Sequence, residues 1–289
     1  MAQQYTQIAV LSGKGGTGKT TVLASFAALA RDKVLVDCDV DAANLYLLLH
    51  PEAERREDFW GAKIAVRAAD KCRRCGECER RCRFGAITVD AIREANCEGC
   101  GLCVLACPNQ ALTLESIING VFEVSGTDYG PMVHAKLKPA AENSGRLVSR
   151  VRQVAEDVAL QQGKRLILID GPPGIGCTVT ATLVDVDVSV MVTEPSLSGM
   201  HDMERVVELA GHFNVPVAVV INKADINPEN TGIIEAFCAE RGIPVLAKLP
   251  FDDIVVQSNA QQVPLVEYTD RPVAAAVREA WSRLMDLVA

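Results

Sequence analysis

The chain has 289 residues, of which 49% are hydrophobic and 23% are charged, a composition typical of a globular protein. Its formal net charge of −8 argues against a general affinity for nucleic acid or for anionic membranes. It has no apolar run of membrane-spanning length and no signal-peptide pattern at the N-terminus, so we expect a cytoplasmic protein that does not bind a membrane.

The N-terminal segment has the pattern strand, loop, helix, strand. QIAVLS (7–12) is an apolar run, TTVLASFAALA (20–30) has a helical pattern, and KVLVDCD (33–39) predicts a second buried strand. Between the first two, GKGGTGKT (13–20) fits the phosphate-binding pattern G-x-x-x-x-G-K-[ST]. Its backbone N–H groups can surround phosphate oxygens, and the N-terminus of the following helix favours negative charge.

This loop predicts the residues of an ATP site. Lys19 would pair with the β- and γ-phosphates, and the Thr20 hydroxyl would bind Mg²⁺. We expect the nucleotide to contact Gly13, Gly15, Gly16, Thr17, Gly18, Lys19, Thr20, Thr21 and Gly174. Lys14 is one lysine more than such a loop requires.

Acidic residues at two strand ends complete the predicted Mg²⁺ site. Asp170 ends the apolar run RLILID, and Asp37, Asp39 and Asp41 follow the second strand. Carboxylates there would hold the metal or orient the attacking water, with Thr20, Asp39 and Asp170 as the expected Mg²⁺ residues. Asp41 also fits a solvated strand end. Asn222 fits recognition of a base edge or a simple polar loop.

The rest of the chain predicts an α/β fold with an insertion. A helix at 146–162 begins a series of strands (165–170, 188–195, 217–225 and 243–250) and helices (197–213 and 271–289). Their alternation predicts a doubly wound, mostly parallel sheet formed by residues 1–50 and 129–289. Residues 51–128 interrupt it, and a hairpin turning at Asn119-Gly120 is expected over 112–126. The last helix carries only two basic residues beside its apolar stripe, Val273, Val277, Trp281 and Leu284, so we expect it to pack on the domain.

Eight of the eleven cysteines lie between residues 72 and 107, in two C-x2-C-x2-C-x3-C runs that repeat with a period of 25. This is the bacterial two-cluster ferredoxin pattern, in which the fourth cysteine of each run ligates the other [4Fe–4S] cluster. We therefore expect a ferredoxin domain over about 64–117, with one cluster held by Cys72, Cys75, Cys78 and Cys107 and a second by Cys97, Cys100, Cys103 and Cys82. Paired zinc sites are the alternative, and the spacing fits them poorly. Pro108 follows the second run, whereas Arg83 takes its place after the first.

Residues 71–83 carry a local charge of +4 in this acidic chain. Positive charge there would raise the reduction potential of a nearby cluster and attract an acidic electron-transfer partner. A solvated charged face is the other interpretation, and the sequence leaves both open.

The remaining single residues suggest structural roles. Cys38 and Cys238 are expected to be buried packing residues, and a small core cysteine is the favoured interpretation of Cys177. His134 lies in an apolar, strand-like stretch and is expected to be a structural residue.

Three segments, KGGTGKTT, VDCDVDAANL and DGPPG, together resemble the deviant Walker A ATPases, the group of MinD, ParA, Mrp-like carriers and the nitrogenase iron protein. The resemblance implies a P-loop NTPase fold of the SIMIBI type and a dimer in which Lys14 contacts the phosphates held by the neighbouring subunit. It further implies that Asp39 activates water, that Asp37 is its neighbour in the Mg²⁺ shell, and that Asp170 is the switch II acid. Asn222 and the run from Pro250 to Asp252 match the adenine-side loops.

The whole chain resembles the branch of these ATPases that contains an inserted ferredoxin domain. This implies an Mg²⁺-dependent ATPase, slow unless partnered, with two [4Fe–4S] clusters, acting as a homodimer or with a related sister chain. The first hypothesis is a nucleotide-gated electron carrier with a redox protein as partner. The second is an iron–sulfur cluster carrier or maturation factor, although the C-x-x-C of Mrp-like carriers is missing. The third is a ParA-like or MinD-like positioning switch with redox-sensing clusters. In the nitrogenase iron protein a cysteine at the spacing of Cys177 ligates a bridging cluster, but this chain offers no clear second cysteine for one.

Overall fold

The computed structural model describes residues 5–40, 43–138 and 144–289, so Asp41 lies outside the described residues. The chain divides into two compact units, described separately below. The first unit comprises Met1–Arg56, Glu123–Ala135 and Ser144–Ala289, and the second comprises Glu57–Phe122 and Lys136–Asn143. The division falls within three strands, β3 (Glu52–Phe59), β6 (Gly120–Gly126) and β7 (Met132–Leu137).

The main sheet has nine strands among the described residues, in the order β11-β10-β9-β1-β8-β2-β7-β6-β3. The strands not yet introduced are β1 (Thr6–Ser12), β2 (Lys33–Asp37), β8 (Leu166–Pro173), β9 (Val188–Thr193), β10 (Val217–Ile221) and β11 (Val245–Lys248). Every strand pairing from β11 to β7 is parallel. The predicted mostly parallel α/β sheet is therefore confirmed.

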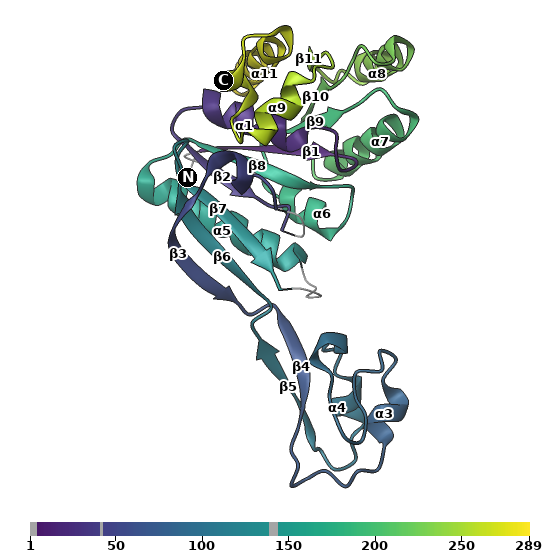
Figure 1. Cartoon of the computed structure of the whole chain (residues 1–289). Helices are drawn as coiled ribbons and strands as arrows, with labels where there is room; N and C mark the ends of the chain where they lie inside the picture. Colours follow the sequence, from purple (N-terminus) through teal and green to yellow (C-terminus); the bar gives the residue numbers. More distant parts are fainter. Residues whose placement is uncertain (1–4, 41–42, 139–143) are drawn as a thin grey trace. The chain divides into compact units, whose positions relative to one another are not determined.

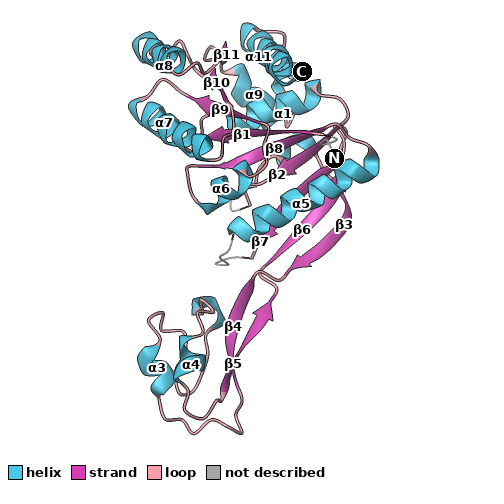
Figure 2. Ribbon diagram, turned by 180° about the vertical axis from the view of Figure 1, so that it is seen from behind, coloured by secondary structure: helices cyan, strands magenta, loops and turns pink. Residues whose placement is uncertain are grey.

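Helices cover both faces of this sheet (Figure 1). On one side, α1 (Lys19–Leu29), α10 (Leu265–Tyr268) and α11 (Pro272–Val288) pack together, and on the opposite side α5 (Ser144–Gln162) packs beside α6 (Cys177–Leu183) (Figure 2). Side chains alternate between the two faces of a strand, so β1 can be buried at every position from Ile8 to Leu11 only because both faces are covered. The remaining helices of this unit are α2 (Tyr46–Leu49), α7 (Leu197–His212), α8 (Pro228–Glu240) and α9 (Ile254–Ala260).

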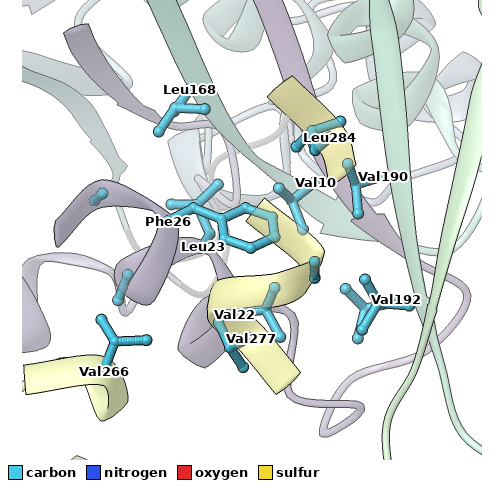
Figure 3. Packing of buried hydrophobic residues seen from close by; sticks show 14 of the residues in the cluster. Val10, Val22, Leu23, Phe26, Leu168, Val190, Val192, Val266, Val277 and Leu284 are labelled. Atoms are coloured by element: carbon cyan, nitrogen blue, oxygen red, sulfur yellow. The ribbon is translucent and has the colours of Figure 1, made fainter. Parts of the chain in front are cut away.

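The core beneath α1 joins the two ends of the chain (Figure 3). Phe26 of α1 is fully buried and its ring lies 5.2 Å, centroid to centroid, from that of Trp281 on α11. Val277 and Leu284 of α11 are buried in the same cluster as Val10 of β1. The expectation that the last helix packs on the domain is confirmed. No helix among the described residues is long and apolar enough to cross a membrane.

The second unit repeats one local structure. Its short helices α3 (Glu77–Arg81) and α4 (Leu102–Ala106) lie at the 25-residue period of the cysteine runs. Each follows a left-handed glycine, Gly76 with φ 78° and Gly101 with φ 77°, a conformation that favours glycine. A 3₁₀ turn (Glu94–Asn96) and an antiparallel pair, β4 (Ala62–Arg67) with β5 (Leu112–Ile117), complete the unit.

The hairpin expected over 112–126 is wrong. β5 pairs with β4, whereas β6 belongs to the main sheet. Asn119 is buried and not at an exposed turn: its Oδ1 accepts from the Gly61 N–H at 2.8 Å and its own N–H donates to the Phe59 carbonyl. These long-range bonds determine the path of the chain, and the local Asn-Gly turn signal does not.

The packing of α11 predicts unequal effects of two leucines on the same helix. Leu284→Ala removes a fully buried side chain and should lower the free energy of unfolding by about 2–5 kcal/mol. Leu287→Ala, on a side chain that is 52% exposed, should change it by less than about 0.5 kcal/mol. Urea denaturation measures both, and equal effects would contradict this account of the core.

Candidate functional site

The glycine-rich loop lies between β1 and α1, at the carboxyl end of a central strand. Gly18, at the N-cap of α1, has φ 93°, and a Cβ on it would lie 2.4 Å from Nδ2 of Asn222. Both the backbone conformation and the close approach therefore require glycine at this position. Gly16 also has a positive φ, 82°.

A buried ion pair stands at the start of α1. Nζ of Lys19 lies 2.5 Å from Oδ1 of Asp170, and the Thr20 hydroxyl donates to Oδ2 of the same carboxylate at 2.9 Å. β8 pairs with both β1 and β2, so Asp170 lies beside the loop on one side and opposite Asp37 on the other. Sequence analysis predicted these residues for one site, and the fold brings them together.

Asp37 and Asp39 act electrostatically on the ammonium group that Asp170 pairs with. Asp37, Asp39 and Asp170 are all buried, as is Lys19. Burial, reinforced by the Asp170 charge, raises the pKa of Asp37 to about 8, although its oxygens accept from the N–H groups of Asp39 and Leu45. Burial lowers the pKa of Lys19 but the adjacent Asp170 raises it, with a net upward shift. An excess of buried carboxylate oxygens is the donor set that Mg²⁺ prefers.

The loop also contains a polar atom without a partner. Oγ1 of Thr17 is buried and has no hydrogen-bond partner in the described structure. Most buried hydroxyl groups have a hydrogen-bond partner. An unpartnered hydroxyl in a phosphate-binding loop therefore fits a site in which the oxygen of a bound ligand accepts its hydrogen bond. Lys19, Thr20 and Thr17 together therefore fit a nucleotide phosphate with its magnesium ion.

The predicted base-side residues make internal contacts. Asn222 donates from Nδ2 to the Thr17 carbonyl at 2.7 Å and accepts from the N–H of Lys223, so it supports the phosphate loop. The carboxylate of Asp252 accepts from the Ile254 N–H and pairs with Arg271 at 2.9 Å. Pro250 lies two residues after the end of β11, with Leu249 between them. A role in base recognition stays a prediction for all three.

Lys14 is held by a group that the sequence analysis missed. Its Nζ lies 2.7 Å from Oε1 of Glu194 and within 3.2 Å of the hydroxyls of Ser196 and Ser198. Lys223 pairs with the other oxygen of Glu194 at 3.0 Å. The segment TEPSLS (193–198) could have indicated this contact. Its polar residues follow β9, whose carboxyl end lies beside that of β1, where the phosphate loop begins.

The second unit holds two cavities lined by cysteine. One is lined by Arg67, Arg73 and Arg74 together with Cys72, Cys75, Cys78 and Cys107. The other, of about 300 Å³, is lined by apolar side chains, by Arg81, Arg83 and Glu98, and by Cys82, Cys97, Cys100 and Cys103. These are the two sets, each with its exchanged fourth cysteine, that the repeat predicts. The structure brings each set to one cavity, while its role as cluster ligands stays a prediction.

The donor chemistry of both cavities fits iron–sulfur clusters. The Ala111 N–H donates to Sγ of Cys107 at 3.3 Å, and the Ala65 N–H donates to Sγ of Cys97 at 3.5 Å. Such bonds favour thiolates, the form of cysteine that binds metal. No three His, Cys, Asp or Glu side chains among the described residues are grouped to hold a single metal ion.

The remaining predictions for single residues have mixed outcomes. Cys38 and Cys238 are fully buried, and His134 contacts the Ser125 hydroxyl at 3.1 Å, as expected for structural residues. The core interpretation of Cys177 is wrong, because the side chain is exposed. It is the first residue of α6, directly after the loop that contains Gly174 and Gly176, where the end of the helix leaves it open to solvent.

A strand, a glycine-rich loop and a Lys-Thr helix start, set against a buried aspartate on the adjacent parallel strand, define a P-loop nucleotide-binding protein. The family described as the CobQ/CobB/MinD/ParA nucleotide binding domain matches residues 8–265. The chain belongs to this family of P-loop ATPases, which confirms the family predicted from the loop and strand-end motifs.

Relatives match over nearly the whole chain. Uncharacterized protein MJ0578 of Methanocaldococcus jannaschii is 31% identical over 98% of this chain and 97% of its own. An iron-sulfur cluster carrier protein of Pyrococcus abyssi is 24% identical over 97% of this chain and 85% of its own. Among solved structures, the septum site-determining protein MinD of Pyrococcus horikoshii OT3, complexed with Mg-ADP, has a TM-score of 0.62 at 19% identity and covers 99% of this chain and 98% of that one. That likeness shows the fold.

The buried ion pair predicts that Lys19 stabilises the protein, in addition to its predicted role in ATP binding. Lys19→Ala leaves Asp170 buried without its cation and should lower the free energy of unfolding by about 3–5 kcal/mol, while ATP binding is lost. Lys248→Ala is the control, because its pair with Glu235 is exposed and is worth at most about 1 kcal/mol. Urea unfolding and calorimetric ATP titration measure the two effects, and equal stability of the two variants would contradict the interpretation.

The cysteines outside the cavities should differ in reactivity. Burial raises the pKa of Cys38 to about 12 and that of Cys238 to about 11, so at pH 8 both remain protonated and shielded. Iodoacetamide should therefore modify the exposed Cys177 well before either of them. Peptide mass spectrometry after timed labelling measures the order, and urea-unfolded protein, in which all three react, is the control. Labelling of Cys38 as fast as Cys177 would show that this part of the core opens.

Proposed function

We propose that the protein is an ATP-hydrolysing iron–sulfur protein that acts as a dimer and passes electrons to or from a redox partner under the control of its nucleotide state. The observation that carries this proposal is the presence, in one chain of an ATPase family, of a P-loop site and of two cavities with four cysteines each. In it, the second unit is the inserted two-cluster ferredoxin-like domain, corresponding to about 64–117 within residues 51–128. Residues 1–50 and 129–289 form the ATPase domain.

Each cavity would hold one [4Fe–4S] cluster, whose chemistry is the uptake and release of a single electron. Cys72, Cys75, Cys78 and Cys107 would ligate one, and Cys97, Cys100, Cys103 and Cys82 the other. The N–H groups of Ala65 and Ala111 would stabilise the thiolate charge, and Arg67 would add positive charge beside the first cavity.

At the ATP site, the ion pair of Lys19 would open when nucleotide binds. Lys19 would turn from Asp170 to the β- and γ-phosphates, while Thr20, Asp39 and Asp170 would hold Mg²⁺. Asp39 would orient the attacking water, with Asp37 beside it at the end of β2. The orphan hydroxyl of Thr17 would gain a phosphate oxygen as its acceptor.

The dimer would require Lys14 to leave Glu194 and reach the phosphates of the neighbouring subunit. Its side chain is 32% exposed and that of Glu194 is 18% exposed, so the pair is worth at most about 1 kcal/mol. Contact with a desolvated phosphate would readily offset the loss of that pair. Glu194 would keep Lys223 as its partner.

Nucleotide state could reach the second unit along one strand. β2 ends at Asp37 and pairs with β7, where Asp37 lies opposite His134 of β7. The same strand continues past Ala135 into residues of the second unit. Movement of the β2 end on ATP binding would therefore act on a segment that connects the two units.

A second candidate function is delivery of iron–sulfur clusters. The carriers of that name from Pyrococcus abyssi, Pyrococcus furiosus and Pyrococcus horikoshii are each 24% identical to this chain over 97% of its length. After Cys107 the sequence has only Cys177 and Cys238, which are too far apart to form a C-x-x-C pair. Loss of clusters to an apo-acceptor during ATP turnover would favour this function.

Cluster reduction followed by EPR, with and without Mg-ATP, tests electron gating in anaerobically purified protein. We expect ATP to change the fraction of reduced cluster at a fixed potential. Lys14→Ala should abolish that change and lower ATP turnover by about a hundredfold, because phosphate contacts across the dimer are lost. Lys223→Ala, which removes the other lysine bound to Glu194, is the matched control and should retain both. Clusters whose reduction ignores nucleotide would contradict gating.

A further inference from the structure

The two cysteine lobes of the second unit repeat in backbone but not in surface chemistry. α3 carries Glu77, Glu79, Arg80 and Arg81 on a helix of five residues. At the same positions of the repeat, α4 carries Leu102, Val104, Leu105 and Ala106. α4 packs on α3 and β5, which accounts for part of its apolar surface, but Leu105 is 86% exposed and gains nothing from that packing. An apolar side chain left in solvent at this position points to something that covers it.

Three apolar side chains form what we call the apolar patch: Phe84, Leu102 and Leu105. Their exposed fractions are 48%, 41% and 86%. Leu102 and Leu105 are three residues apart on α4 and so lie on the same side of it. Phe84 and Leu102 both line the cavity of Cys82, Cys97, Cys100 and Cys103, so the patch lies against that cavity.

Arginines border the patch. Arg81 and Arg83 line the same cavity, and both are exposed. Glu98 is the only acidic residue that lines it among the described residues. Protein interfaces commonly have aromatic and aliphatic side chains at the centre and arginine around them. The positive charge of the arginines favours a partner with an acidic surface.

A second copy of this chain is a poor occupant. In a two-fold dimer the same patch meets itself, which would bring Arg81 and Arg83 of one copy close to the same arginines of the other. Like charges in a closed interface cost free energy, whereas the carboxylates of an acidic protein would pair with them.

We propose that the apolar patch and its arginine border are the docking site for a small acidic one-electron carrier protein. This rests on the proposed function, in which the neighbouring cavity holds a redox cofactor. One electron passes between the carrier's redox centre and the cofactor held by Cys82, Cys97, Cys100 and Cys103, and no bond is made or broken. The carrier is the reductant in one direction and the oxidant in the other.

The test is binding of an acidic two-cluster ferredoxin to the intact, cluster-loaded protein, measured by calorimetry at low and high salt. Leu105→Gln should weaken binding about tenfold, because it removes the most exposed apolar contact. The double variant Arg81→Gln/Arg83→Gln should weaken it about tenfold at low salt, and by less at high salt as screening reduces the charge effect. Iron content, measured for each variant, should equal that of the wild type.

Matched controls lie on the first unit. Leu160→Gln changes a leucine that is 52% exposed on α5, and Arg31→Gln changes an exposed arginine after α1. Both should bind the ferredoxin as the wild type does. A basic cytochrome c, used as a second probe, should not bind at the patch.

Three outcomes would overturn the inference: no binding of ferredoxin to the wild type, equal loss in the Leu160 control, or a Leu105→Gln variant that changes the mass of the protein's own oligomer in light scattering. The last would make the patch an interface between copies. Each of these leaves iron content and the ATP effect on cluster reduction intact. Absence of iron from the wild type would instead contradict the proposed function.

Discussion

The site depends on one buried ion pair. Lys19 and Asp170 are paired at 2.5 Å among two further buried carboxylates, Asp37 and Asp39. A charge in such a place is tolerated only with a partner, so the pair holds the start of α1 against the end of β8. The same excess of carboxylate makes the site suited to a divalent cation and lets a nucleotide phosphate compete for the lysine. Stability and ligand exchange therefore rest on the same atoms.

The order of strands connects the nucleotide site to the strand that continues into the second unit. β8 lies between β1 and β2, so the phosphate loop, Asp170 and Asp37 meet at one edge of the sheet. β2 in turn pairs with β7, which continues into the second unit. In the proposed function, nucleotide turnover changes the conformation of the phosphate loop, Asp170 and Asp37. β7 then transmits this change to the second unit. The second unit would then present two cofactors, both beside arginines, of which only one also lies beside the apolar patch.

Short covalent spacings explain which features the sequence predicts well. The phosphate loop and each cysteine run are short, continuous stretches of sequence. The left-handed glycines Gly76 and Gly101 are separated by the same 25 residues as the two cysteine runs. The contacts that were missed join distant segments. Glu194 meets Lys14 only because β9 lies beside β1, and Asn222 reaches the Thr17 carbonyl from the end of β10. Likewise Asn119-Gly120 resembles a hairpin turn locally, yet bonds to Gly61 and Phe59 direct β5 and β6 to different sheets.

In the proposed function, an ATPase of this family carries two iron–sulfur clusters in its second unit. Iron, sulfide and zinc analysis of anaerobically purified protein, with Mössbauer spectroscopy, tests it most directly. We expect about eight iron and eight sulfide per chain in [4Fe–4S] form. We also expect Cys75→Ser to disturb one cluster and Cys100→Ser the other. About two zinc per chain, with no sulfide, would contradict it and would make the cysteine cavities structural zinc sites.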